Sequence, residues 1–281
     1  MTNICRSLLF APGSRPEIFA KTLVAGADLV AIDLEDAVAP ALKADARIAG
    51  IRFLGESDGT GPRRALRMNA LDTAFGLTDL VAVAEASLQH GLLFMPKINS
   101  PRDLQIADTV LTAAGSGLGL IALIETLDGL EAVHEIAQAT PRLELMMFGG
   151  VDFSVELGTT LDREPLHYAR SRIIHAARRA GIPALDVPTI AFRDDDIVRS
   201  DAEYARLLGF SGKAVLHPSN VATVNEAFSP SDAEVEEAKA IIAAFEASDT
   251  GVAVLDGKLV EAPVVKSMQN ILALAAAEGR E

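Results

Sequence analysis

The chain has 281 residues, 49% of them hydrophobic, with a net charge of −14 and a mean hydropathy of +0.26. This composition supplies a large core, and the acidic balance argues against a nucleic-acid-binding protein. Because the sequence has no apolar run long enough to span a membrane and only one cysteine, Cys5, we expect a cytoplasmic protein without internal disulfides.

Short apolar runs recur along the chain, with helical segments between them. They predict buried parallel strands at residues 6–10, 29–34, 64–68, 92–96, 119–125, 144–148, 184–187 and 213–217. Helices are expected near residues 16–25, 40–51, 76–89, 101–114, 127–139, 167–180, 195–208 and 231–247. Eight alternating units favour a closed (β/α)8 TIM barrel, an α/β fold, over residues 1–248.

Residues 249–281 follow the last predicted barrel unit. The segment DTGVAVLDGKLVEAP alternates apolar and polar residues around Asp256-Gly257, a dipeptide typical of hairpin turns. A helix is expected over residues 262–278. Such an extension serves either as a lid or subunit contact or as a plain surface cover, and we expect the lid and contact role.

Polar side chains stand at or just after the ends of most predicted strands, and a barrel gathers such residues at one mouth. They are Asp33, Glu35, Asp36, Arg67, Asn69, Lys97, Glu125, Asp152, Asp186 and His217. A single one of them could be a helix cap or the partner in a loop salt bridge. Several around one mouth indicate a functional site.

Glu125 and Asp152 are the most informative pair in this set. They lie 27 residues apart, which is about one strand–helix unit of a barrel. Two carboxylates on neighbouring strand ends form an oxygen-only site that suits Mg2+, with water and substrate completing the coordination. Arg67 is suited to bind a substrate carboxylate or a developing oxyanion. The alternative is that Arg67 only neutralises the acidic stretch from Asp33 to Asp36.

A series of motifs along nearly the whole chain resembles the citrate lyase β-subunit-like proteins of the HpcH/HpaI aldolase superfamily, which include malyl-CoA and citramalyl-CoA lyases. The motifs are RSLLFAPGSRPE, GADLVAIDLEDAVAP, Arg67-Met68-Asn69, MPKI, IETLDGL, FGGVDFSVELG, SRIIHAARRAG and GFSGKAVLHPSN. The resemblance implies a (β/α)8 barrel that forms trimers or multiples of trimers, with a C-terminal segment that reaches a neighbouring subunit.

The same resemblance implies roles for the residues at the mouth. Glu125 and Asp152 would hold Mg2+, with Mn2+ as an alternative, and Glu125 would also face the substrate. Arg67 would bind the 2-oxo acid and polarise its oxygen. Glu35 and Asp36 match an acidic stretch that orders metal-bound water or Arg67.

Four further positions follow from the resemblance. Phe10, Arg15 and Lys21 match residues that contact the CoA thioester. Glu261 stands where the family commonly has a catalytic Asp on the lid, so we expect Glu261 to be the acid/base. The extra methylene of Glu moves the carboxylate, which affects turnover.

The expected activity is the reversible cleavage of a 3-hydroxyacyl-CoA to acetyl-CoA, or a homologue, and a 2-oxo acid. A competing hypothesis is a metal-dependent aldolase of free 4-hydroxy-2-oxo acids, but those enzymes carry a His where this chain has Asp36. The resemblance also leaves room for an acyl-CoA thioesterase, a non-catalytic subunit that docks an acyl-carrier protein, or a binding protein without turnover.

Overall fold

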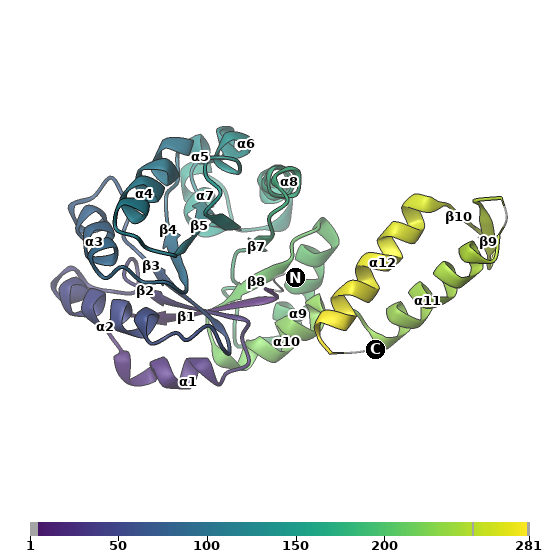
Figure 1. The fold of residues 1–281 in the computed structure, drawn as a ribbon, viewed down its shortest axis with the longest axis horizontal. Helices are drawn as coiled ribbons and strands as arrows, with labels where there is room; N and C mark the ends of the chain where they lie inside the picture. The colour runs from purple at the N-terminus through teal and green to yellow at the C-terminus, as the bar shows by residue number, and fades with distance from the viewer. Residues whose placement is uncertain (1–4, 249, 280–281) are drawn as a thin grey trace. The chain divides into compact units, whose positions relative to one another are not determined.

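The structure is a computed structural model that describes residues 5–248 and 250–279. Eight parallel strands form a closed barrel in chain order, and the first strand pairs with the last, Leu8 opposite Ala214. The strands are β1 (Ser7–Pro12), β2 (Leu29–Asp33), β3 (Arg63–Arg67), β4 (Leu92–Met95), β5 (Gly119–Ile124), β6 (Leu143–Phe148), β7 (Ala184–Asp186) and β8 (Gly212–Val215). The predicted (β/α)8 barrel is confirmed (Figure 1).

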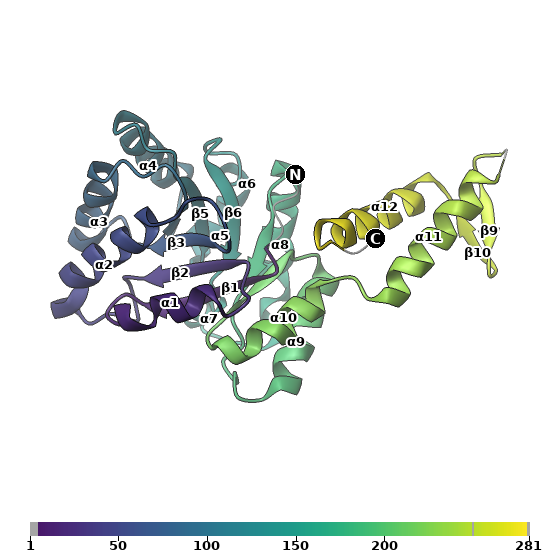
Figure 2. The same cartoon turned by 60° about the horizontal axis from the view of Figure 1, so that its bottom comes forward.

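Helices cover the outer face of the barrel (Figures 1 and 2). They are η1 (Pro16–Ile18), α1 (Phe19–Leu23), η2 (Pro40–Leu42), α2 (Lys43–Gly55), α3 (Ala74–Glu85), α4 (Pro101–Ala113), α5 (Leu127–Glu131), α6 (Val133–Ile136), α7 (Gly150–Leu157), α8 (Arg163–Ala180), α9 (Asp195–Leu208), η3 (Pro218–Asn220) and α10 (Val221–Phe228). The short helices α7 and α10 were not predicted. Helix α7 begins at the pair Gly149-Gly150, which is typical of loops, and this obscured the helical pattern behind it.

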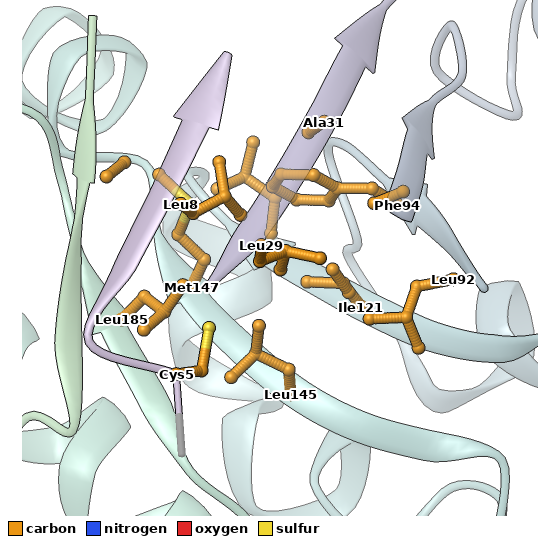
Figure 3. Close-up of a cluster of buried hydrophobic side chains, with 13 residues drawn as sticks. Cys5, Leu8, Leu29, Ala31, Leu92, Phe94, Ile121, Leu145, Met147 and Leu185 are labelled. Atoms are coloured by element: carbon orange, nitrogen blue, oxygen red, sulfur yellow. The ribbon is translucent and has the colours of Figure 1, made fainter. Parts of the chain in front are cut away.

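Apolar side chains fill the inside of the barrel, so the barrel is a packed core without a pore (Figure 3). The buried cluster comprises Cys5, Leu8, Leu29, Ala31, Ala65, Leu92, Phe94, Ile121, Leu123, Leu145, Met147, Leu185 and Ala214. Burial of each large aliphatic or aromatic side chain stabilises the fold by about 1.5–3 kcal/mol. Leu123 and Met147 belong to this core and also line the cavity at the carboxyl ends of the strands. The core therefore forms the floor of the site.

Strand register sets which residues emerge together at that end. Asp33 pairs with Pro12 on one side and with Arg67 on the other, and Ile124 pairs with Phe148. Residues at or just beyond these positions therefore stand at one level. This places the predicted site residues of β1, β2, β3, β5 and β6 around one mouth.

The described residues from 226 onward form a compact unit separate from Cys5–Asn225. It contains α11 (Asp232–Glu246), the strands β9 (Ala253–Leu255) and β10 (Lys258–Val260), and α12 (Ala262–Ala277). The two strands are antiparallel around Asp256-Gly257, both with positive φ, as the turn dipeptide predicts. Helix α11 was grouped with the barrel in the sequence analysis but packs with the hairpin and α12 in this unit.

A small apolar core holds this second unit together. Ile241 of α11, Val260 of β10 and Val265 of α12 are its buried members.

Among the helices of residues 5–248 and 250–279, none is long and apolar enough to cross a bilayer.

Candidate active site

The carboxyl ends of the barrel strands surround one cavity of about 440 Å3. Six residues predicted from the sequence line it: Phe10, Asp33, Asp36, Arg67, Glu125 and Asp152. They come from five different strand ends, so only closure of the barrel brings them together. The rest of the wall is largely apolar, and much of it comes from β6, β7, β8 and the segments that follow them, including Val151, Val187, Pro188, Ile190 and Leu216.

Glu125 follows β5 directly and is 2% exposed. Its Oε1 accepts a hydrogen bond of 2.9 Å from the backbone N–H of Lys97, which fixes the carboxylate from the β4 side. On the β6 side it lies against Gly149, where an added Cβ would clash with the Cβ of Glu125 and stand 2.7 Å from its Oε2. The missing side chain at Gly149 therefore provides the space that Glu125 occupies.

Asp152 lies in the first turn of α7, the short helix after β6. Its side chain is half-exposed toward the cavity, and its Oδ1 stands 3.9 Å from the ammonium of Lys97. The unpredicted helix α7 therefore carries the second predicted metal ligand. An acidic side chain in the first turn is favoured there by the helix dipole.

Negative charges crowd this end of the barrel. Burial, together with the charges of Glu35 and Asp152, raises the pKa of Glu125 to about 8. Burial and, more weakly, the charges of Asp36 and Asp33 raise the pKa of Glu35 to about 7 against the opposing effect of Arg67. A divalent cation beside Glu125 and Asp152 would relieve this repulsion.

The donor set fits Mg2+. Within the residues that the structure describes, no group of three or more His, Cys, Asp or Glu side chains is placed to hold a metal alone. Mg2+ commonly takes one or two protein carboxylates and completes its octahedron with water and substrate oxygens. Glu125 and Asp152, on a shared cavity wall, could provide those two carboxylates.

Arg67, at the end of β3, is held by the acidic stretch after β2. Its Nε and Nη2 each donate a 2.7 Å hydrogen bond to one oxygen of Asp33. Its Nη1 lies 3.1 Å from Oε2 of Glu35 and 3.5 Å from Oδ2 of Asp36. Arg67 thus neutralises the acidic stretch and also lines the cavity, and its role toward a substrate stays a prediction. Asp33 holds Nε and Nη2, and Glu35 and Asp36 lie beside Nη1, so a substrate oxygen would share Nη1 with these two carboxylates.

Residues 6–218 match the family described as HpcH/HpaI aldolase/citrate lyase. The chain belongs to this family. An L-malyl-CoA/beta-methylmalyl-CoA lyase from Cereibacter sphaeroides is 35% identical, with 95% of this chain and 93% of that protein covered. A (3S)-malyl-CoA thioesterase from Cereibacter sphaeroides is 38% identical, with 97% of this chain and 95% of that protein covered.

A solved structure of the protein CitE from Mycobacterium tuberculosis, in complex with magnesium, acetoacetate and coenzyme A, is also similar. It superposes with a TM-score of 0.84 at 31% identity and covers 97% of this chain and 98% of that chain. Membership of the HpcH/HpaI aldolase/citrate lyase family, expected from the motifs, is thus confirmed.

The positions that this family resemblance assigned to CoA are spread over the β1–α1 segment. Phe10 lines the cavity, stacks on Phe94 with ring centroids 5.8 Å apart, and carries the Arg67 guanidinium 5.1 Å above its ring. Arg15 and Lys21 lie on the surface instead, and Arg15 pairs with Glu17 at 3.0 Å. The roles of Arg15 and Lys21 in CoA binding stay predictions.

Glu261, the lid residue expected from the family resemblance, is exposed at the start of α12. It belongs to the second compact unit, whereas the cavity lies wholly in the first. Its role as acid/base therefore stays a prediction.

A small aromatic stack in the loops after β7 and β8 was not predicted from the sequence. Phe192 stacks on His217 with centroids 5.8 Å apart, and Arg193 stands 5.4 Å from the Phe192 ring centroid. Asn220 anchors the stack by donating a hydrogen bond of 2.9 Å to the backbone carbonyl of Phe192. Ile190 and Leu216, which line the cavity, are its near neighbours in sequence. Only the pairing of loops from β7 and β8 creates this surface.

Asp186, one of the polar residues at the predicted strand ends, is buried between two cationic side chains. It is 1% exposed, with Oδ1 3.0 Å from Nε of Arg170 and Oδ2 3.0 Å from Nζ of Lys213. Lys213 also donates to the carbonyl of Val187. Asp186, Arg170 and Lys213 lie outside the cavity wall, so this buried cluster braces β7 and β8 against α8.

Proposed function

We propose that the protein is a Mg2+-dependent carbon–carbon lyase that cleaves a 3-hydroxyacyl-CoA of the malyl-, citramalyl- or citryl-CoA type. The products would be acetyl-CoA, or a homologue, and a 2-oxo acid. The observation that carries the proposal is the buried Glu125 beside Asp152, in one cavity with Arg67. The lyase from Cereibacter sphaeroides, at 35% identity over 95% of the chain, supports it.

The proposed reaction breaks the C2–C3 bond of the thioester. Transfer of the 3-hydroxyl proton to water ordered at the mouth lets the C2–C3 electron pair leave as the thioester enolate, and C3 becomes the keto carbon of the oxo acid. When bound at Glu125 and Asp152, Mg2+ would polarise the hydroxyl oxygen and align the adjacent carboxylate. Nη1 of Arg67, oriented by Asp33, would donate a hydrogen bond to an oxygen that bears developing charge.

The enolate then needs a proton at carbon, which Glu261 would supply and, in the condensing direction, remove. Glu35 and Asp36 would hold Arg67 and order water at the mouth. Because a lid carboxylate acts on a site it covers, we propose that residues 249–281 close over the 1–248 barrel of a neighbouring subunit. A homotrimer, or a multiple of trimers, is the corresponding assembly.

The surface around the mouth supports a CoA ligand. The Phe192–His217 stack offers a flat aromatic face with the cation of Arg193 beside it, which suits a heteroaromatic ring that carries phosphates. Arg15 and Lys21 supply further exposed positive charge on the β1–α1 segment. The single thiol, Cys5, is free and buried, which agrees with a cytoplasmic setting.

A thioesterase is the second candidate, favoured by the (3S)-malyl-CoA thioesterase at 38% identity. In that reaction, water attacks the thioester carbonyl and the C–S bond breaks, which releases CoA as a free thiol. The C2–C3 bond stays intact. The same metal carboxylates and CoA surface would serve both reactions. Free thiol is the product that distinguishes them.

The test incubates the purified protein with Mg2+ and malyl-, citramalyl- or citryl-CoA, and measures free thiol and trapped 2-oxo acid separately. Oxo acid without free thiol, lost in Glu125→Ala, is the expected result and names the substrate. Free thiol without oxo acid would instead establish the thioesterase. If none of the three thioesters reacts, the acyl-CoA proposal is wrong.

A further inference from the structure

Lys97 has an unusual conformation for its residue type. It follows β4 in the MPKI motif, and its φ of 50° lies in the left-handed region that favours glycine. A lysine gains nothing from that conformation, and its Cβ is strained against the backbone there. Its surroundings must therefore hold it there, and strain of this kind gathers at functional sites.

Two contacts explain the strained backbone. The backbone N–H of Lys97 points at Oε1 of Glu125, 2.9 Å away. Its side chain places Nζ 3.8 Å from Oε1 of Glu35 and 3.9 Å from Oδ1 of Asp152. One residue thus contacts three carboxylates, and two of them are the proposed metal ligands.

The charge balance of the mouth shows why a cation is needed there. Five carboxylates meet at it, those of Asp33, Glu35, Asp36, Glu125 and Asp152. Arg67 is committed to the first three of these. The remaining positive charge in contact with the cluster, among the residues that the structure describes, is the ammonium of Lys97.

We propose that Lys97 is the internal counter-ion of the metal-free site, against which Mg2+ binds. Its ammonium holds Glu35 and Asp152 near each other without metal, and its backbone N–H aims Glu125 at the same point. With 38% of its side chain exposed, Lys97 can swing outward when the ion arrives. Lys97 is a positioning residue, and it would keep Mg2+ affinity low enough for reversible loading. This inference rests on the proposed metal site.

The test measures Mg2+ affinity by titration calorimetry without any substrate. Lys97→Met keeps the length of the side chain and removes its charge. Lys97→Gly removes the charge and also suits a positive φ, while both variants keep the backbone N–H. Lys97→Arg keeps the charge. All variants are measured at one pH and one ionic strength, so that screening is the same for each.

We expect both Lys97→Met and Lys97→Gly to bind Mg2+ about tenfold more tightly than the wild type, since a nearby like charge is removed. Lys97→Arg should stay near the wild-type value. Without metal, Lys97→Met should melt at a lower temperature than the wild type and gain more on addition of Mg2+. Lys239→Met, which removes an exposed ammonium on α11, is the matched control and should change neither quantity.

Other outcomes separate the two proposals. Unchanged or weaker Mg2+ binding by both Lys97→Met and Lys97→Gly would overturn the counter-ion role and leave the lyase proposal intact. Weaker binding by Lys97→Gly together with unchanged binding by Lys97→Met would mean that Lys97 acts only through its backbone geometry, which also overturns the counter-ion role. If the wild type itself fails to bind Mg2+, the metal site and the proposed function fail together.

Discussion

Gly149→Ala tests the packing that places Glu125. Gly149 has a φ of −95° and a ψ of 65°, so an alanine there meets no left-handed strain. Its Cβ would nevertheless stand 2.7 Å from Oε2 of Glu125 and clash with the Cβ of the same residue. Non-bonded carbon atoms prefer about 3.5–4.0 Å, so Glu125 must retreat by roughly 1 Å.

A displacement of that size has two separate consequences. Misplacement of a reacting group by about 1 Å can lower turnover by about 100-fold. Overpacking of a tight site lowers the free energy of unfolding by about 1–3 kcal/mol, which leaves most domains folded. We therefore expect Gly149→Ala to fold, to bind Mg2+ more weakly and to lose most of its lyase activity.

The assay combines urea unfolding, Mg2+ titration and oxo-acid release from the preferred thioester. Gly55→Ala is the control, because Gly55 ends α2 and its added Cβ would meet only the flexible side chain of Leu88, at 3.2 Å. That variant should keep wild-type Mg2+ affinity and activity. Wild-type values for both quantities in Gly149→Ala would refute the argument that this glycine makes room for Glu125.

Three further predictions concern other parts of the chain. Burial raises the pKa of the Cys5 thiol to about 12, so almost none of it is thiolate at pH 8. A disulfide reagent should therefore label Cys5 only after unfolding in urea, and rapid labelling of the native protein would contradict this. Asp186→Ala leaves the buried cations of Arg170 and Lys213 without their carboxylate partner, and should lower the free energy of unfolding in a urea titration by about 3–5 kcal/mol. A loss below about 1 kcal/mol would show that this cluster does not stabilise the fold. Glu261→Gln should lower proton exchange at the acetyl methyl of acetyl-CoA by about 100-fold or more, with Mg2+ affinity unchanged, whereas Asp256→Asn should have little effect. Equal losses in both variants would argue against Glu261 as the specific acid/base.

The barrel could be predicted because its strands carry their signal locally. A run such as GLIALI is buried at every position, and eight such runs alternate with helical segments. The helix α7 was missed because glycines open it, and α11 was grouped with the barrel because amphipathic periodicity does not tell which partner a helix packs against.

The sequence by itself determined the fold class, the family and the positions of Glu125, Asp152 and Arg67, since strand ends are set by local pattern and parallel strands end at one face. Tertiary structure alone decided the partners of these residues. Asp33 takes one edge of Arg67, and Lys97 contacts Glu35 and Asp152, because barrel closure and strand register bring distant segments to the same level. Hydrogen bonds and charge contacts between strands depend on that register, which a single sequence does not encode locally.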